Sequence, residues 1–139
     1  MILVSLAKTR TQENLLNYFF GKCTNFEVMY PNDDADDNFD NPLLEGKNEF
    51  LKLKNITIAA WSGMKNSIRI FGVLDNDVKE IFYRSLNRKG IWKYSLFDNE
   101  SEVFSVSDFD VGVLRISQAE FKHLIHTNII CSDDLFIMI

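Results

Sequence analysis

Short apolar runs, separated by residues that favour turns, are the feature that most constrains how this chain can fold. The runs are rich in Val, Ile, Leu and Phe and have the length and alternation of β-strands. Three other segments repeat apolar residues every three or four positions, as amphipathic helices do. The mixture predicts a single α+β domain over residues 1–139, with a mostly antiparallel or mixed sheet of about six to seven strands and three helices.

The expected strands differ in how they are buried and joined. Residues 2–6 are short and apolar, so we expect a strand buried on both faces. Residues 50–61 change the phase of their alternation near Asn55, which predicts strand structure with a break or bulge there. Residues 91–97 and 103–106 predict a hairpin whose loop is longer than two residues. The other expected strands cover residues 26–30, 68–73, 111–116 and 135–139.

The three helices are expected to begin with capping boxes, in which Ser, Thr or Asp precedes Glu or Gln by three residues. The pairs with this spacing are Thr9 and Gln12, Asp77 and Glu80, and Ser117 and Glu120. Thr11 is an alternative cap for the first helix. Gly90 is placed to supply a left-handed cap after the second helix.

The composition excludes several classes of protein. A length of 139 residues allows one ordinary domain, which needs no disulfide or structural metal to fold. Cys23 and Cys131 are far apart in the sequence, so we expect both to be reduced. No apolar run is long enough to span a membrane and the N-terminus lacks a signal pattern, so we expect a cytoplasmic protein without a membrane partner. No catalytic or cofactor-binding motif occurs, and no cofactor is expected.

Negative charge is concentrated in one part of the chain. The net charge is −5, from fifteen Lys and Arg against twenty Asp and Glu. No basic residue lies between Lys22 and Lys47, and the rest of the chain is close to neutral. Residues 32–42 are almost entirely Asn, Asp and Pro, which predicts an acidic loop at about residues 32–46. The carboxylates between the two lysines are Glu27, Asp33, Asp34, Asp36, Asp37, Asp40 and Glu45.

The acidic loop has two main interpretations. Asp and Asn favour turns and are well solvated, so the loop is explained as an ordinary surface connection. Alternatively it is a docking surface for a basic protein, because a concentrated negative field accelerates association with such a partner and disfavours nucleic acid. Aromatic anchors near the loop would strengthen the contact. The predicted contact residues are Asp33, Asp34, Asp36, Asp37, Asp40, Glu45, Tyr30, Phe39 and Trp61.

A third interpretation of the acidic loop is a calcium site. Its carboxylates partly follow the spacing of an EF-hand loop, in which Phe39 takes the position that requires Gly. Pro31 also precedes the loop where a helix should enter. A calcium-responsive binding module is therefore an alternative function. The residues at template positions 1, 3, 5, 7 and 12 are Asp34, Asp36, Asn38, Asp40 and Glu45.

The only two histidines suggest a second alternative. Glu120, His123 and His126 are spaced to share one face of the third helix, opposite its apolar face, and we expect them to be exposed. A small enzyme that uses this face for acid and base chemistry is therefore an alternative function. A metal site is not expected, because the Glu-x-x-His pattern occurs once and lacks further carboxylates. A solvated helix face explains the same spacing.

One basic and aromatic cluster suggests stacking on a nucleic acid. Cations at a helix C-terminus already have a structural reason, since they complement the helix dipole. The cluster contains Arg84, Arg88, Lys89, Trp92, Lys93 and Tyr94.

A compact, acidic, cysteine-poor chain of this size, with the segment NDDADDNFDN at residues 32–41, resembles the bacterial immunity proteins that neutralise secreted nuclease toxins, including those of contact-dependent growth inhibition systems. The resemblance implies a non-enzymatic antitoxin whose carboxylates cover the basic active site of a toxin. A nuclease site is electropositive because it binds phosphates, so an acidic inhibitor suits it.

Overall fold

The computed structural model describes residues 1–31, 41–62 and 67–138. Eight strands of the described residues form one sheet in the order β3-β4-β2-β5-β6-β7-β1-β8, and all neighbours are antiparallel. The predicted α+β class is confirmed. The strands are β1 (Ile2–Ser5), β2 (Asn25–Tyr30), β3 (Ile56–Ala60), β4 (Ile68–Val73), β5 (Tyr94–Asp98), β6 (Ser101–Ser107), β7 (Val111–Leu114) and β8 (Leu135–Met138). The α-helices are α1 (Thr9–Phe20), α2 (Lys47–Leu51), α3 (Asn76–Ser85) and α4 (Gln118–His126), and the 3-10 helices are η1 (Pro42–Leu44) and η2 (Ser132–Asp134).

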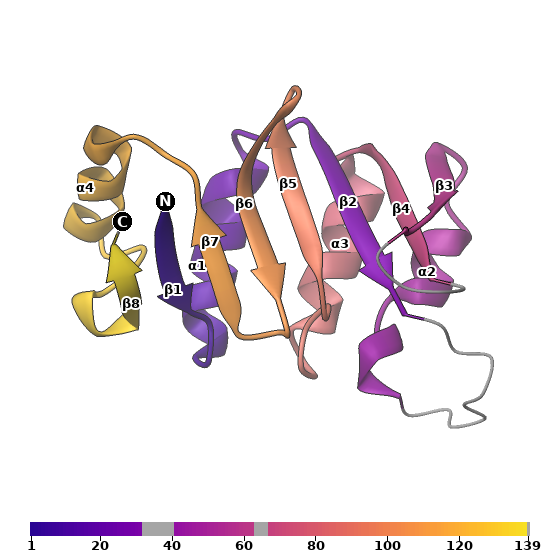
Figure 1. Ribbon diagram of the computed structural model, residues 1–139, viewed down its shortest axis with the longest axis horizontal. Coiled ribbons are helices and arrows are strands. Elements are labelled where there is room, and N and C mark those ends of the chain that lie inside the picture. Colours follow the sequence, from indigo (N-terminus) through magenta and orange to yellow (C-terminus); the bar gives the residue numbers. More distant parts are fainter. Residues whose placement is uncertain (32–40, 63–66, 139) are drawn as a thin grey trace.

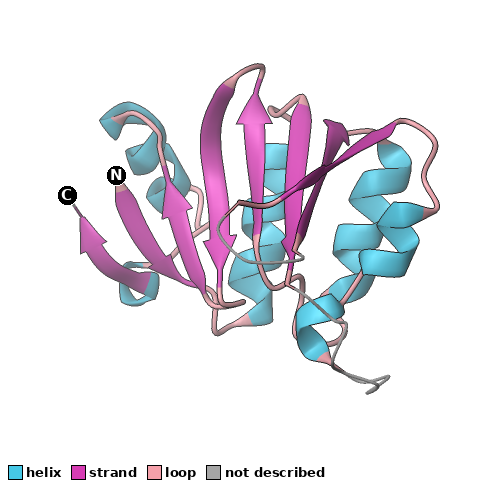
Figure 2. Cartoon of the chain, turned by 45° about the vertical axis from the view of Figure 1, so that its right-hand side comes forward, coloured by secondary structure: helices cyan, strands magenta, loops and turns pink. Residues whose placement is uncertain are grey.

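The sheet is covered by helices on one face (Figures 1 and 2). α1 and α3 run across its middle, α2 lies at the end with β3 and β4, and α4 lies at the end with β1 and β8. In β1, Ile2 and Val4 are buried whereas Leu3 and Ser5 are half-buried. The expected burial of this strand on both faces is therefore wrong, because no helix of the described residues covers the opposite face.

α1 begins without the predicted capping box. Thr9 lies inside the helix, and no side chain caps the N-terminus. The two polar residues that follow are buried and have partners far away in the sequence. The hydroxyl of Thr11 donates to the carboxylate of Asp134 (3.3 Å), and the side-chain oxygen of Gln12 accepts from the hydroxyl of Tyr94 (2.9 Å). These side chains satisfy buried groups instead of the helix terminus.

The other two helices keep most of the predicted signals. The cap of α3 is Asp75, whose carboxylate accepts from the N–H of Val78 (3.0 Å), and not Asp77, which lies in the first turn. Ser117 caps α4 as predicted by accepting from the N–H of Glu120 (3.1 Å). Gly90 has a φ of +86°, the left-handed conformation expected of it.

Two local predictions are wrong. Residues 50–61 form the short helix α2 and the separate strand β3, because the ring of Phe50 packs in the core against Phe26 and Phe82 (centroids 5.5 and 5.6 Å). The loop between β5 and β6 has only two residues, Asn99 and Glu100. Asn99 has a φ of +57°, as the first residue of a tight hairpin turn requires.

Phe82 on α3 is the centre of an aromatic core. Its ring is fully buried and contacts four other rings, all of them edge-on, at 4.8 to 6.4 Å between centroids. Edge-to-face pairs of this kind add to the free energy of burial. The four rings belong to Phe20, Phe26, Phe50 and Tyr94.

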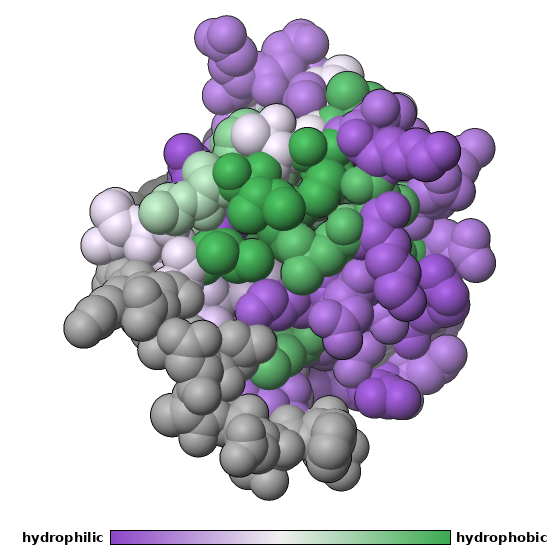
Figure 3. Space-filling view, turned by 90° about the vertical axis from the view of Figure 1, so that its right-hand side faces the viewer, coloured by the Kyte–Doolittle hydropathy of each residue, from purple (hydrophilic) through white to green (hydrophobic). Residues whose placement is uncertain are grey.

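The edge of the sheet at β3 carries exposed apolar side chains. Figure 3 looks at the molecule from this side and shows apolar residues gathered on it. Three of the six large apolar side chains that are exposed among the described residues belong to α2, β3 and β4: Leu51, Ile58 and Val73. No charged residue lies within Ile56–Ala60.

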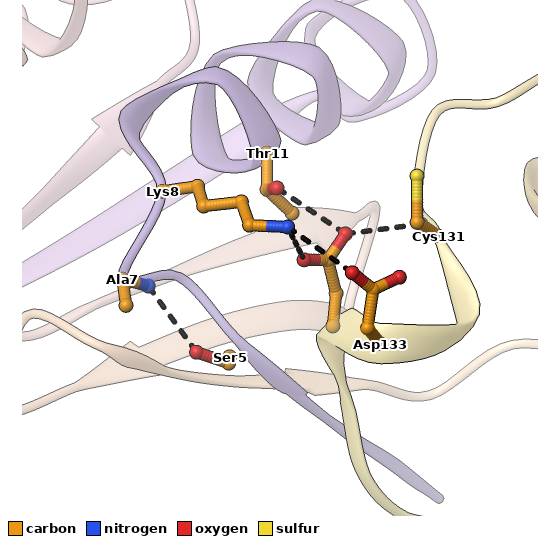
Figure 4. A network of polar contacts seen from close by, with 7 residues as sticks. Ser5, Ala7, Lys8, Thr11, Cys131 and Asp133 are labelled. Atoms are coloured by element: carbon orange, nitrogen blue, oxygen red, sulfur yellow. Dashed lines mark hydrogen bonds and ion pairs between the residues drawn. The ribbon is translucent and has the colours of Figure 1, made fainter.

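At the opposite edge, a polar network holds the C-terminal segment against the start of α1 (Figure 4). Asp134 is buried and accepts from the hydroxyl of Thr11 and the backbone N–H of Cys131 (3.0 Å). The ammonium of Lys8 lies 3.4 Å from the carboxylate of Asp133 and 3.6 Å from that of Asp134. The network places η2, and therefore β8, beside β1.

Candidate partner-binding surface

The acidic loop leaves the sheet at the end of β2, and the strand register shows what lies around this point. Tyr30, the last residue of β2, is level with Ile68 of β4, which is in turn level with Ala60 of β3. Trp61 follows Ala60 and donates its N–H to the carbonyl of Ser67 (3.0 Å). Neighbouring strands are about 4.8 Å apart, so Trp61 lies about 10 Å from the end of β2, where the chain enters the acidic loop.

A second tryptophan reaches the same end of the sheet from β5. The carbonyl of Lys93 accepts from the N–H of Met29 (3.1 Å), so Trp92 lies near the end of β2 on its other side. The rings of Trp61 and Trp92 meet edge-on with centroids 6.1 Å apart, and both are half-buried. The indole N–H of Trp92 donates to the carboxylate of Asp108 (3.1 Å). We call Trp61 and Trp92 the tryptophan pair.

Tyr30 does not contribute to this surface. Its ring is fully buried in the core, and its hydroxyl donates to the backbone carbonyl of Glu45 (2.8 Å). Burial, followed by the nearby charges of Glu49 and Glu45, raises the pKa of Tyr30 well above its ordinary value. The prediction of Tyr30 as a contact residue is therefore corrected: it is a core residue that fixes the far end of the acidic loop.

The C-terminal part of the acidic loop is regular structure rather than loop. Asn41 caps η1 by accepting from the N–H of Leu43 (3.0 Å), and Gly46 precedes α2 with a φ of +83°. A Cβ at Gly46 would lie 3.2 Å from the hydroxyl of Tyr30, so Gly is required for both conformation and space. The carboxylate of Glu45 lies 3.5 Å from the guanidinium of Arg88. Residues 41–46 are therefore held against β2 and α3.

The other predicted contact residues lie outside the described residues. They are Asp33, Asp34, Asp36, Asp37, Phe39 and Asp40. Of the seven carboxylates between Lys22 and Lys47, the structure describes Glu27 and Glu45, and both have cationic neighbours: Glu45 lies near Arg88, and Glu27 near Arg69 (3.7 Å). The remaining negative charge is concentrated in residues 33–40.

For the calcium alternative, only Glu45 of the five template residues is described, and its carboxylate faces Arg88. In the described ranges, no group of three or more His, Cys, Asp and Glu side chains is arranged to hold a metal ion. Asp34, Asp36, Asn38 and Asp40 lie outside those ranges.

Glu120 is engaged in a clamp between α1 and α4. One oxygen of its carboxylate accepts from the hydroxyl of Tyr18 (2.5 Å) and from the ammonium of Lys22. Its side chain is 17% exposed, whereas His123 and His126 are exposed. The ring of His123 lies 6.2 Å from that of Tyr18. These contacts make Glu120 a structural residue that joins the two helices. The two histidines are exposed, as predicted.

The clamp makes stability depend on pH. Burial by itself raises the pKa of Glu120, but the hydrogen bonds from Lys22 and Tyr18 and the nearby positive charge outweigh it, so the pKa lies below the usual 4.5. The unfolded chain therefore binds the proton more readily. The stabilisation is present above about pH 4.5 and is lost as the pH falls through the lower pKa of the folded protein.

We expect Glu120→Gln to lower the free energy of unfolding by about 1–2 kcal/mol at pH 7, because the hydrogen bond from Lys22 then no longer meets a charge. The difference from the native protein should shrink as the pH is lowered below 4.5. Urea unfolding between pH 7 and pH 3 measures both effects, with Glu80→Gln as the control, since the Glu80 to Arg84 pair (3.8 Å) is exposed. An equal loss at every pH would contradict the clamp.

The basic and aromatic cluster is not one surface. Tyr94 is fully buried, and the cations have separate neighbours. Arg84 lies 3.8 Å from Glu80, Lys89 stands over the ring of Phe109 (5.0 Å), and Lys93 donates to the hydroxyl of Ser107 (3.2 Å). A continuous groove of cations and stacked rings, as single-stranded nucleic acids require, is not formed by these side chains.

The sequence alone does not indicate that Trp92 lies near the end of β2, because the two are more than fifty residues apart and the pairing of β2 with β5 brings them together. Among the described residues, no helix has both the length and the apolar character needed to cross a membrane.

No family model, curated protein or solved structure matches this chain. The candidate binding surface is therefore argued from the residues and contacts of this chain alone.

Proposed function

We propose that the protein is a non-enzymatic immunity protein that binds and neutralises a basic protein partner in the cytoplasm, and that this partner is a nuclease toxin of the contact-dependent growth inhibition type. The observation that carries the proposal is the concentration of carboxylates in residues 33–40 of the sequence, which follow β2, together with the aromatic pair at the end of that strand. Charge and aromatic surface together are what fast and tight association needs.

The concentrated negative charge supports a basic nuclease as the partner. Neighbouring carboxylates repel one another well within the Debye length of about 8 Å at physiological salt, so their concentration works against folding. Glu27 and Glu45 are relieved by Arg69 and Arg88, but residues 22–47 contain no cation between their ends. A basic partner removes the repulsion when it binds. A nuclease cannot lose its positive charge without losing its phosphate substrate.

The tryptophan pair supports a specific contact. Charge alone raises the association rate, whereas slow dissociation needs buried apolar contacts. Trp61 and Trp92 are half-buried, so they are held in place while part of each ring remains exposed. Rigid aromatic side chains lose little entropy on binding and are frequent hot spots.

An inhibition assay tests the proposal. The probe is a basic nuclease toxin domain, taken first from the open reading frame next to the gene and then from a panel of secreted bacterial nuclease toxins. We expect nuclease activity to fall in proportion to added protein and to vanish at an equimolar ratio. Higher salt should slow the onset of inhibition much more than its reversal. Full nuclease activity at an excess of the protein, for every member of the panel, would contradict the proposal.

A further inference from the structure

We propose that two copies of the protein pair edge to edge through β3, as antiparallel strands related by a two-fold axis at Ile58. The pairing joins two eight-stranded sheets into one continuous sheet. The surface lies at the β3 edge of the molecule and goes beyond the proposed function, which uses the acidic loop and the tryptophan pair.

The hydrogen-bond pattern shows which groups of β3 are available. The N–H of Trp61 donates to the carbonyl of Ser67, so this pair is hydrogen-bonded to the β4 side. Hydrogen-bonded and non-hydrogen-bonded pairs alternate in an antiparallel ladder. Thr57 and Ala59 therefore also bond to β4, through Phe71 and Arg69. The residues between them direct their N–H and C=O groups to the open edge: Ile56, Ile58 and Ala60.

The pairing of β2 with β4 agrees with this assignment. Leu74 donates its N–H to the carbonyl of Thr24 (2.9 Å), which makes Ile70 and Gly72 bond toward β2. Their neighbours on β3 are Ile58 and Ile56. The outward groups of β3 thus have no strand partner among the described residues, since β3 is the first strand of the sheet.

In the part of the chain that the structure describes, this edge lacks the usual protection against pairing. Sheet edges are normally protected by charged side chains, proline, bulges or a covering element. β3 contains none of these residues, its register with β4 is continuous, and Ile58 is 51% exposed at its centre. Leu51 of α2 and Val73 of β4 are also exposed. Figure 3 shows apolar residues gathered on this side of the molecule.

The strand is complementary to itself. In an antiparallel pair centred on Ile58, this residue faces its own copy and Ile56 faces Ala60 of the partner copy. Every outward N–H then meets an outward C=O, because the three outward residues are spaced evenly about the centre. The two isoleucines at the centre form a β-branched cross-strand pair, which favours such a ladder. A two-fold contact of this kind closes on itself and produces a dimer.

Charge selects a second copy over the basic partner of the proposed function. Lys52 and Lys54 directly precede β3, and both are exposed. A basic strand would meet like charges there. In the symmetric pair, Lys54 lies opposite position 62 of the other copy, and the two Lys54 residues are about 27 Å apart, well beyond the Debye length. The symmetric contact therefore keeps the two Lys54 side chains apart.

Sedimentation equilibrium of the full chain tests the proposal. We expect a reversible dimer, and we expect Ile58→Lys to weaken it about ten-fold or more, because the two-fold axis places the two new cations face to face. The matched control is Phe136→Lys on β8, the other edge strand, where the side chain is 55% exposed. It should leave the dissociation constant unchanged. A monomer at all concentrations, or a dimer lost in Phe136→Lys and kept in Ile58→Lys, would overturn the proposal.

Cysteine cross-linking tests the register without relying on a loss of binding. In a background carrying Cys131→Ser, since Cys131 is exposed, Ile58→Cys should form a disulfide-linked dimer under mild oxidation. Directly opposed residues have Cα atoms about 5.5 Å apart, within the range of a disulfide. Thr57→Cys is the control, because its counterpart is displaced along the strand. Equal cross-linking of the two variants would overturn the two-fold register, and unchanged thermal unfolding of both shows that the fold is kept.

Discussion

Changing Asp33, Asp34, Asp36 and Asp37 together to Asn should slow association with a basic nuclease toxin by about ten- to a hundred-fold at low ionic strength. The four substitutions remove most of the charge that residues 33–40 present, while dissociation should change much less because the tryptophan pair is untouched. The fold should be unaffected or slightly more stable, since like charges are removed. Stopped-flow association over a range of salt concentrations measures the effect.

A control variant with the same change in net charge tests whether the position of the negative charge, or only its amount, determines the association rate. Four exposed carboxylates elsewhere in the chain serve as the control, changed to their amides: Glu13, Asp77, Glu80 and Glu100. This control should lose only a few-fold in association rate, because its charges lie on other parts of the surface and are screened. Equal slowing in both variants would mean that the net charge, and not the acidic loop, guides the encounter.

Phe82→Ala should lower the free energy of unfolding by about 3–5 kcal/mol, a larger loss than we expect from Glu120→Gln. The ring is fully buried and contacts the rings of Phe20, Phe26, Phe50 and Tyr94. Its removal leaves a cavity among four rigid side chains that cannot easily collapse. Since native domains are stable by only about 5–15 kcal/mol, a large part of the stability is lost.

Urea unfolding of Phe82→Ala beside Phe136→Ala provides the comparison. Both variants lose the same ring, but Phe136 is 55% exposed, so its loss should cost less than about 1 kcal/mol. A cost for Phe82→Ala no greater than for Phe136→Ala would contradict the description of Phe82 as the centre of the core.

Local signals in the sequence were sufficient where an element depends on its own neighbours. β2 ends at Tyr30 before Pro31, as its pattern predicts, and Ser117 caps α4 through a contact only three residues away. The signals failed where partners are distant. Thr11 and Gln12 have the composition of a helix start, but their side chains bond to Asp134 and Tyr94, which no local rule identifies.

The candidate surface was only partly predictable for the same reason. The charge of the acidic loop is visible in the composition alone, whereas the tryptophan pair exists because β3, β4, β2 and β5 lie in that order. Tyr30 was misleading because a tyrosine next to a loop suits either a surface or a core. Its hydroxyl bonds to a backbone carbonyl, which allows the whole ring to be buried.

The most direct test is an NMR titration of the labelled protein with an inactive form of the basic nuclease toxin. The chain has only two tryptophans, so its indole N–H signals report on the tryptophan pair alone. If the acidic loop and the tryptophan pair bind the toxin, both indole signals and the amides of residues 32–41 shift together as the complex forms. Unchanged indole signals and unchanged amides in that segment, with shifts on α1 and α4 instead, would show that the partner binds elsewhere and would contradict the proposed binding surface.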